Sequence, residues 1–407
     1  MTSPATAGTE SEGPTPVGLW SRAFVVLCGL SFIAGIAAAP FQSLLPVYVE
    51  ADLQRLPVFT AYLKGLTLLL GGVFAIVGGR LADLLGLKFT LLLGLAGSGL
   101  TGLVFHSTHV VPLTMLVLLI GAAHGPLSTA GQSYLINCAG PQRLGLGGAL
   151  YFLSFTGGNS VGNFCTGLVK DAWSFPRLGT TMTLIMVGVV AGGLLLLPST
   201  RVPRAADVPR QGLQLWRSYR PLLARRDVLL LLGLRLSITS FWGMATLALP
   251  LLVYRASQSA ATAAYYGAVS LAVAAAGQLL TGLLRDRYGR TGPLIISSLG
   301  IVASAACLAL YTDSVAGLFV FGTSLTATAW AVSTLVPALI AEVADADEKN
   351  LLVGLGHMVW SGAMVTGSIM GGILIEVGAH VPFALGVIHA SVGTLCTWRL
   401  CVRLDNR

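Results

Sequence analysis

The sequence is poor in charged residues. Only 10% of its 407 residues are charged and 55% are hydrophobic, whereas soluble domains usually carry roughly a quarter charged residues. This composition makes a soluble enzyme, a disordered protein and a nucleic-acid-binding protein poor descriptions of the chain, and we expect no nucleic-acid partner. The formal net charge of +8 has another origin, because its placement along the chain follows a membrane rule.

Cysteine is also scarce and lacks metal-binding spacing. The six cysteines lie in or at the ends of apolar stretches, and no two of them form a CxxC pair. We therefore expect neither a disulfide framework nor a metal site, and no cofactor. The cysteines are Cys28, Cys138, Cys165, Cys307, Cys396 and Cys401.

Groups for catalysis at membrane depth are missing as well. No metal-ligand cluster and no pair of carboxylates falls within an apolar stretch, so we expect no catalytic residue and no enzyme activity. Residues 158–162 spell GNSVG, a hydrolase nucleophile pattern, but that pattern needs a preceding strand and here it lies inside an apolar stretch. An integral-membrane enzyme is therefore the last of the alternatives.

Long apolar runs dominate the sequence instead. A bilayer crossing needs about 20 apolar residues, and twelve such stretches occur, separated by short polar segments. They predict an all-α integral membrane protein with twelve transmembrane helices and no sizeable soluble domain. The stretches are residues 23–48, 59–79, 89–107, 112–136, 144–168, 178–198, 228–253, 264–284, 293–311, 316–341, 351–375 and 382–402.

The longest polar interval divides the chain into two halves of six helices each. Within this interval, residues 213–223 have the composition of a short amphipathic element on the membrane surface, but we favour a plain linker. The predicted units are a disordered tail at 1–19, a six-helix bundle at 20–198, a central loop at 199–227, a second six-helix bundle at 228–403 and a tail at 404–407.

The positively charged residues favour one side of the membrane. With twelve crossings both termini lie on the same side, and 18 of the 24 Lys and Arg residues fall in segments on that side. Because Lys and Arg are enriched in cytoplasmic loops, we predict that both termini and the central loop are cytoplasmic. We expect a multi-pass protein of the cell membrane (plasma or inner membrane).

Two short loops repeat the same pattern. Residues 79–88 read GRLADLLGLK and residues 282–291 read GLLRDRYGRT. Three pairs of residues at matching positions are 203 residues apart: Gly79 and Gly282, Asp83 and Asp286, Gly86 and Gly289. Gly162 and Gly367, in the fifth and eleventh stretches, are 205 residues apart. Matches at nearly one offset indicate two pseudo-repeats.

With its twelve helices, the chain resembles the major facilitator superfamily, whose signature loop contains a Gly, a small residue, an Asp, a basic residue, a second Gly and then Arg or Lys. The resemblance covers the whole chain and implies two six-helix pseudo-repeats around a central cavity. The first copy departs from the pattern at Leu84 and Leu87, where the superfamily usually has basic residues. We assign to this gating-loop motif Gly79, Asp83, Gly86 and Lys88 in the first copy, and Gly282, Asp286, Arg287, Gly289 and Arg290 in the second.

The residue types of this motif suit a latch between the halves. Glycines allow a tight turn, an Asp can face the positive N-terminus of a helix in the other half, and basic residues can reach carboxylates there. Such contacts would form in one state of the transport cycle and break in the other. For Arg80 and Arg285 a purely topogenic role is an equal alternative. The expected acidic partners are Glu342, Asp345, Asp347 and Glu348.

Three basic residues fall inside apolar stretches. A charged side chain at the bilayer centre costs at least about 2.5 to 3.5 kcal/mol, so each one needs a reason. Arg235 is expected to face the central cavity or a buried partner, with extension to the interface as the alternative, whereas Lys64 is expected to extend to the surface. His124 lies mid-helix beside Gly125 and Pro126, and either serves binding and proton coupling or is a packing residue.

Acidic residues are missing from the interior of the apolar stretches. Proton-coupled members of the superfamily often use a buried carboxylate, and many carry an Arg where Val117 stands. Proton coupling here would therefore depend on His124, His357 or a carboxylate at a helix end, and facilitated diffusion or exchange stays open. The excess of basic groups makes an anionic organic substrate plausible. The acidic residues at the ends of stretches are Glu50, Asp227, Glu342 and Glu376.

The helices that line the pathway in the superfamily carry further polar and aromatic residues. Aromatic side chains at mid-depth suit stacking on an organic solute, although tryptophan in a membrane protein serves equally often in packing or at the interface. The candidates for the substrate cavity are Gln42, His124, Gln132, Asn159, Asn163, Arg235, Trp242, Gln278, Trp330, His357 and Trp360.

We predict a secondary transporter that moves a small organic solute by alternating access. Export or exchange of a drug-like or metabolite molecule is the leading hypothesis, and a sugar or organic-anion carrier or facilitator is the second. A non-transporting membrane receptor is the alternative from another class. The expected partners are the solute, the lipid bilayer and, if transport is coupled to a proton gradient, protons. We expect a monomer.

Overall fold

The chain folds into α-helices. The computed structural model describes residues 20–139, 144–198, 215–343 and 349–406, and all regular structure within these ranges is helical. Helices suit lipid because each pairs its own backbone N–H and C=O groups. The first half contains α1 (Arg22–Ala51), α2 (Pro57–Leu85), α3 (Leu87–Ser98), α4 (Thr101–Val104), α5 (Val110–Ala139), α6 (Leu144–Val169) and α7 (Phe175–Leu196). After it come α8 (Leu215–Ala224), α9 (Arg226–Ser257), α10 (Ala260–Tyr288), α11 (Thr291–Leu310), α12 (Val315–Val343), α13 (Lys349–Val377) and α14 (Val381–Asp405).

Nearly every long helix is able to cross a bilayer. Among the described residues, eleven segments are long and apolar enough, with α3 and α4 counted together as Leu87–Val104. The 26-residue helix α6 is not among these eleven, and it packs along α1 and α10; the described part of the chain therefore has about 11–12 spans. The predicted all-α membrane fold is confirmed.

Two segments differ from the sequence-based expectation. The predicted third stretch, residues 89–107, is interrupted between α3 and α4, next to a close approach between the backbones of Gly102 and Gly179 in α7. A Cβ at either glycine would meet the other residue's carbonyl oxygen. The preferred linker interpretation missed α8 in the central loop, where Leu222 is buried and Arg220 is exposed. This separation of apolar and basic residues is typical of an amphipathic helix.

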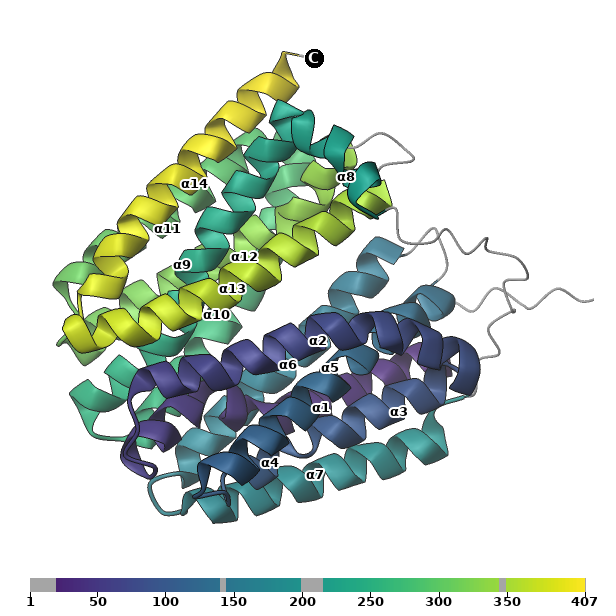
Figure 1. Cartoon of the computed structure of the whole chain (residues 1–407), viewed down its shortest axis with the longest axis vertical. Helices are drawn as coiled ribbons and strands as arrows, with labels where there is room; N and C mark the ends of the chain where they lie inside the picture. The colour runs from purple at the N-terminus through teal and green to yellow at the C-terminus, as the bar shows by residue number, and fades with distance from the viewer. Residues whose placement is uncertain (1–19, 140–143, 199–214, 344–348, 407) are drawn as a thin grey trace, which may run out of the picture.

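The helices form two groups with matching internal contacts. In Figure 1, α1 to α7 make up the lower group and α9 to α14 the upper group. Within the first group α1 packs on α6 and α2 on α5; within the second, α9 packs on α13 and α10 on α12. With α4 counted as part of the third crossing and α8 left out, these are equivalent pairs. The duplication in the sequence is therefore also present in the packing.

Glycines bring the paired helices of each group into close contact. A Cβ on Gly162 of α6 would meet the backbone carbonyl of Ile36 in α1, and a Cβ on Gly367 of α13 would meet that of Ser240 in α9. Small residues allow such close packing between membrane helices. Ile36 and Ser240 are 204 positions apart and the two glycines 205, so the same contact occurs once in each half.

Candidate substrate cavity

The helices run between two faces of the molecule. We call the face where α1 begins and α14 ends the terminal face, and the face where α1 ends and α14 begins the distal face. Because consecutive crossings alternate in direction, α6 and α9 start at the terminal face, whereas α2 and α10 start at the distal face.

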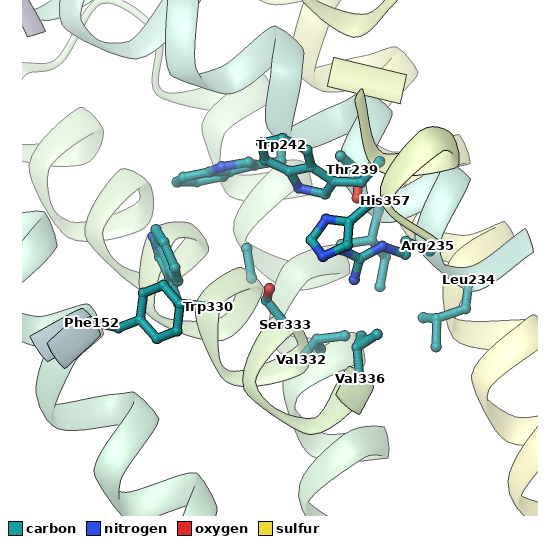
Figure 2. A pocket seen from close by; sticks show the side chains of 13 residues that line it. Phe152, Leu234, Arg235, Thr239, Trp242, Trp330, Val332, Ser333, Val336 and His357 are labelled. Carbon is teal, nitrogen blue, oxygen red and sulfur yellow. The ribbon is translucent and has the colours of Figure 1, made fainter. Parts of the chain in front are cut away.

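A cavity lies among α9, α12 and α13, near the middle of these helices (Figure 2). Its volume is about 320 Å³, within the range of small-molecule sites. Arg235 stands about nine residues from the terminal start of α9, roughly 14 Å along its axis. The lining residues are Phe152, Leu234, Arg235, Ile238, Thr239, Trp242, Ala329, Trp330, Val332, Ser333, Val336, His357 and Trp360.

The cavity contains one permanently charged group, the guanidinium of Arg235. Its Nε donates a hydrogen bond of 2.9 Å to the carbonyl of Gly356 in α13. None of the ion pairs between described residues includes Arg235, which is half-buried. In Figure 2 the imidazole of His357 lies beside it. This end of the cavity is therefore basic.

Aromatic side chains form much of the remaining wall. Trp330 and Phe152 lie together on the side of the cavity away from Arg235, and Trp242 lies above His357 (Figure 2). The indole Nε1 of Trp330 is buried and has no hydrogen-bond partner in the structure. Phe152 of α6 is the one lining residue from the first half, so the cavity adjoins the boundary between the halves.

Sequence reasoning found five of these residues and missed others. Arg235, Trp242, Trp330, His357 and Trp360 were candidates and line the cavity. Among the missed polar residues, one lies four positions after Arg235 and the other three positions after Trp330, so helical spacing places each on the same face as a candidate. No local pattern indicates the aromatic residue from α6. The missed polar and aromatic residues are Thr239, Ser333 and Phe152.

The other six candidates do not line this cavity, and their roles in binding stay predictions. Asn159 and Asn163 are buried within the packing of α6. Asn159 donates to the carbonyl of Phe155, at 2.9 Å, and Asn163 Oδ1 accepts from Ser43 Oγ of α1, at 2.6 Å. The remaining four are Gln42, His124, Gln132 and Gln278; the imidazole of His124 lies against Gly71 of α2.

An ion cluster joins the two halves at the distal face. Arg255 in the last turn of α9 donates from Nε to Glu50 Oε1 at 2.9 Å and from Nη2 to Glu50 Oε2 at 2.6 Å. The same Nη2 donates to Glu376 Oε1 of α13, at 2.8 Å. Glu50 lies in the last turn of α1 in the first half, whereas Arg255 and Glu376 both belong to the second half. The pair of Arg255 and Glu50 therefore crosses the boundary.

Lys64 of α2 lies on the same boundary between the halves, farther from the distal face. Its ammonium group donates to the carbonyls of Gln42 in α1, at 3.4 Å, and Thr246 in α9, at 3.3 Å. The prediction that Lys64 extends to the membrane surface is wrong. Both carbonyl oxygens are free to accept from the ammonium group, because Pro46 lies four residues after Gln42 and Pro250 four residues after Thr246, and neither proline can donate an N–H to these carbonyls.

Asp171 makes a third contact across the boundary, at the start of α10. Its carboxylate accepts from the hydroxyl of Ser259, at 3.1 Å, and from the backbone N–H of Ala261, at 3.3 Å. A negative charge at a helix N-terminus is favourable, because the N–H groups there are unpaired and the helix dipole is positive. Farther along the same two helices, Ser160 of α6 donates to the carbonyl of Ala268, at 2.9 Å.

Lys170, next to Asp171, is buried at the distal end of α6. Its ammonium group donates to the carbonyl of Trp173, at 3.0 Å, and lies 3.9 Å from the centre of the Phe175 ring. Burial lowers the pKa of Lys170, opposed by the nearby carboxylates of Asp52 and Asp171. The chain segment that carries Asp171 is thus anchored by its neighbours.

The contacts between halves concentrate near the distal face. Every hydrogen bond and ion pair that the structure gives between described residues of the two groups belongs to the four contacts centred on Glu50, Lys64, Asp171 and Ser160. We call these contacts the distal layer. The cavity lies on the terminal side of this layer.

The family model described as Major Facilitator Superfamily matches residues 27–338 and 236–406. The chain belongs to the major facilitator superfamily. The superfamily consists of transporters and not of enzymes, and the chain is accordingly a multi-pass membrane protein of a transporter family. The resemblance inferred from the loop motif and helix count is confirmed.

Curated relatives of this superfamily member align over part of their length. The class C tetracycline resistance protein of Escherichia coli is 30% identical over 150 residues, which cover 36% of this chain and 37% of that protein. The class H tetracycline resistance protein of Pasteurella multocida is 26% identical over 154 residues, 37% of this chain and 38% of that protein. The glucose facilitated diffusion protein of Zymomonas mobilis is 36% identical over 112 residues, 26% of this chain and 23% of that protein.

Solved structures of other transporters match nearly the whole fold. The nucleoside transporter NupG superposes with a TM-score of 0.76 at 14% identity, covering 93% of this chain and 99% of that chain. A POT family transporter in complex with 5-aminolevulinic acid gives a TM-score of 0.74 at 13% identity, covering 96% and 98%. At these identities the likeness concerns the fold.

Both copies of the superfamily's loop motif make a tight turn. Gly86 has a φ of 84° and Gly289 a φ of 79°, in the left-handed region that favours glycine. Each of these glycines separates two helices that are otherwise nearly continuous in sequence, α2 from α3 and α10 from α11.

The described charged residues of the motif bind within their own half. Arg290 pairs with Glu342 of α12, at 2.6 Å, and with Asp405 of α14, at 2.7 Å, while Arg285 lies 3.6 Å from Glu342. Lys88 donates to the carbonyl of Leu194 in α7, at 2.8 Å. The side chains of Asp83 and Asp286, and residues 344–348, lie outside the described part of the structure. The latch between halves stays a prediction.

Proposed function

We propose that this transporter exports or exchanges a drug-like or metabolite solute by alternating access, as a monomer with both termini in the cytoplasm. The observation that carries the proposal is the position of the cavity, on the terminal side of the distal layer. If the terminal face is cytoplasmic, this arrangement corresponds to a cavity that accepts solute from the cytoplasm.

The positions of the contacts support rocking of the halves. Among the described residues, ion pairs and hydrogen bonds join them near the distal face, whereas at the terminal ends the ion pairs given lie within one half, as between Arg403 and Asp227 at 2.6 Å. Two groups that are each internally packed and joined along one edge can move as units. Breaking the distal layer and closing the terminal ends would expose the cavity to the other side.

Transport should be measured with purified protein in liposomes. The names of the relatives point to tetracycline and glucose as first solutes, and naphthoate adds an organic anion to the panel. We expect counterflow of at least one of these, above the rate of liposomes without protein. Counterflow of glucose alone would support the sugar alternative, whereas counterflow of tetracycline or naphthoate would support a drug-like solute or an organic anion, respectively. Saturable binding without any counterflow would instead support the receptor alternative.

Orientation and coupling need separate measurements. A reporter fused after Arg407 should behave as cytoplasmic, and an external signal would overturn the topology. Transport with and without an imposed pH gradient tests coupling to protons, for which His357 is the titratable group in the cavity wall.

A further inference from the structure

We propose that the cavity binds an aromatic organic anion, with the acidic group on Arg235 and the ring among the tryptophan side chains. The proposal rests on the proposed transport function and names its substrate class. It follows from the charge, the unpaired donors and the shape of the cavity.

The guanidinium of Arg235 has unused hydrogen-bond donors, and no carboxylate among the described residues pairs with it. Of the five N–H groups in the guanidinium plane, the structure uses one, on Gly356. The open edge matches the two oxygens of a carboxylate. A cation held partly away from water without a negative partner is unfavourable, and a bound anion removes that penalty.

The other polar groups of the wall also favour a hydrogen-bond acceptor. The indole N–H of Trp330 is buried without a partner, and indole nitrogen can only donate. Ser333 and Thr239 add two hydroxyl groups, while no carboxylate and no side-chain amide is among the described residues that line the cavity. A cationic solute would meet the positive charge of Arg235 with no compensating carboxylate.

The two ends of the cavity differ in character. Arg235 and His357 lie together at one side, Trp330 and Phe152 at the other, and Ser333 lies between them (Figure 2). A ligand that spans this space therefore needs an acidic end and a flat apolar end, since aromatic walls favour stacking or edge contacts with a ring. A volume of about 320 Å³ suits a molecule of one or two rings.

The same wall disfavours a sugar. A sugar buries many hydroxyl groups, and each hydroxyl left without a partner costs free energy. Three tryptophans, one phenylalanine and several aliphatic side chains leave too few polar partners for such a ligand.

Binding of three matched probes tests the proposal. We would measure equilibrium binding of 2-naphthoate, 2-naphthamide and 2-naphthylmethylammonium to purified protein at about pH 7, where the carboxyl group is ionised. These probes share one ring system and differ in charge. We expect 2-naphthoate to bind at least roughly tenfold more tightly than the amide, and the cation to bind most weakly. Equal affinity for all three would overturn the proposal without any variant.

Two arginine variants test whether Arg235 binds the acidic group of the ligand. Arg235→Gln should reduce affinity for 2-naphthoate roughly tenfold or more and leave affinity for the amide within about twofold. Arg177→Gln is the matched control, because Arg177 lies exposed at the distal start of α7, over the ring of Trp173. Melting temperatures of both variants verify folding. If the preference for naphthoate survives Arg235→Gln, the assignment to Arg235 is wrong.

The outcomes separate this inference from the proposed function. Counterflow of a neutral or cationic solute together with no preference for naphthoate would remove the anion proposal and leave transport intact. Naphthoate binding that depends on Arg235, without counterflow of any solute, would support the anion proposal and remove the transport proposal.

Discussion

Arg255 and Glu50 form a two-pronged ion pair between equivalent positions of the two halves. The distance from Arg255 Nε to Glu50 Oε1 is 2.9 Å and that from Nη2 to Oε2 is 2.6 Å. The two residues are 205 positions apart, the same offset as Gly162 and Gly367. Gln42 and Thr246, whose carbonyls share the ammonium of Lys64, are 204 positions apart. Equivalent residues of two pseudo-symmetric halves meet only near the axis that relates them. These two contacts of the distal layer therefore lie near that axis.

Loss of the ion pair should open the distal face. Glu50→Gln removes the negative partner across the boundary, and a partly exposed pair is worth about 1 kcal/mol, or roughly a fivefold change in the ratio of the two states. A cysteine at Ser333, in a background without native cysteines, should then react several-fold faster with an impermeant thiol reagent added at the distal face.

Glu376→Gln is the matched control for this experiment. Glu376 binds the same guanidinium, at 2.8 Å, but belongs to the same half as Arg255. Its loss should leave the labelling rate near that of the parent. Equal acceleration in both variants would mean that the cross-boundary pair has no special role.

Asp171 is expected to stabilise the same closed arrangement through the N-terminus of α10. Asp171→Ala removes the acceptor for Ser259 and Ala261, and loss of such a cap costs about 0.5 to 2 kcal/mol. Faster distal labelling of the cysteine at position 333 is expected. Asp313→Ala, at an exposed distal position between α11 and α12, should have no effect on the rate.

Lys64 should contribute more to transport than to stability. Among the described residues no carboxylate pairs with it, and replacing an unpaired, partly buried charge by an apolar side chain is neutral or stabilising. Lys64→Met should therefore keep or raise the melting temperature, by up to about 4 °C per kcal/mol, while counterflow slows. Arg22→Met, at the exposed terminal start of α1, is the control for general loss of a basic side chain. A large drop in melting temperature in Lys64→Met would contradict this account.

The close contact at Gly367 predicts that a larger residue there destabilises the packing of α13 on α9. In Gly367→Ala the new methyl group meets the backbone carbonyl of Ser240, and overpacking of this kind costs about 1 to 3 kcal/mol. The melting temperature should fall by several degrees. Gly362→Ala, on the same helix with open space around its Cβ, should be neutral or slightly stabilising. Similar melting temperatures for both variants would show that α9 and α13 separate more easily than the contact indicates.

The helices were predictable and much of the site was not. An apolar run of sufficient length has few options in lipid, so residue types alone locate the crossings. Arg235 was a candidate because a charge in an apolar run needs a reason, and it does line the cavity. Phe152 was missed because one phenylalanine among many apolar residues carries no local signal.

The distal layer was missed for a different reason. Glu50 and Arg255 each look like ordinary residues at a helix end, and their contact depends on how the halves meet. The offset of 205 positions was available from the sequence, and opposite charges at equivalent positions near the expected axis would have indicated the pair. Lys64 was misplaced because distance from the helix end alone does not reveal on which side of the helix a residue lies.

Distances between spin labels on opposite faces test the central claim, that the two halves rock about the midplane cavity. One label pair would replace Arg177 and Asp313 at the distal face, the other Leu84 and Tyr288 at the terminal face, all exposed positions. In liposomes we expect a short distal and a long terminal distance, and in Glu50→Gln a second population with a longer distal and a shorter terminal distance. A distal distance that lengthens while the terminal distance stays unchanged would contradict rocking of the halves.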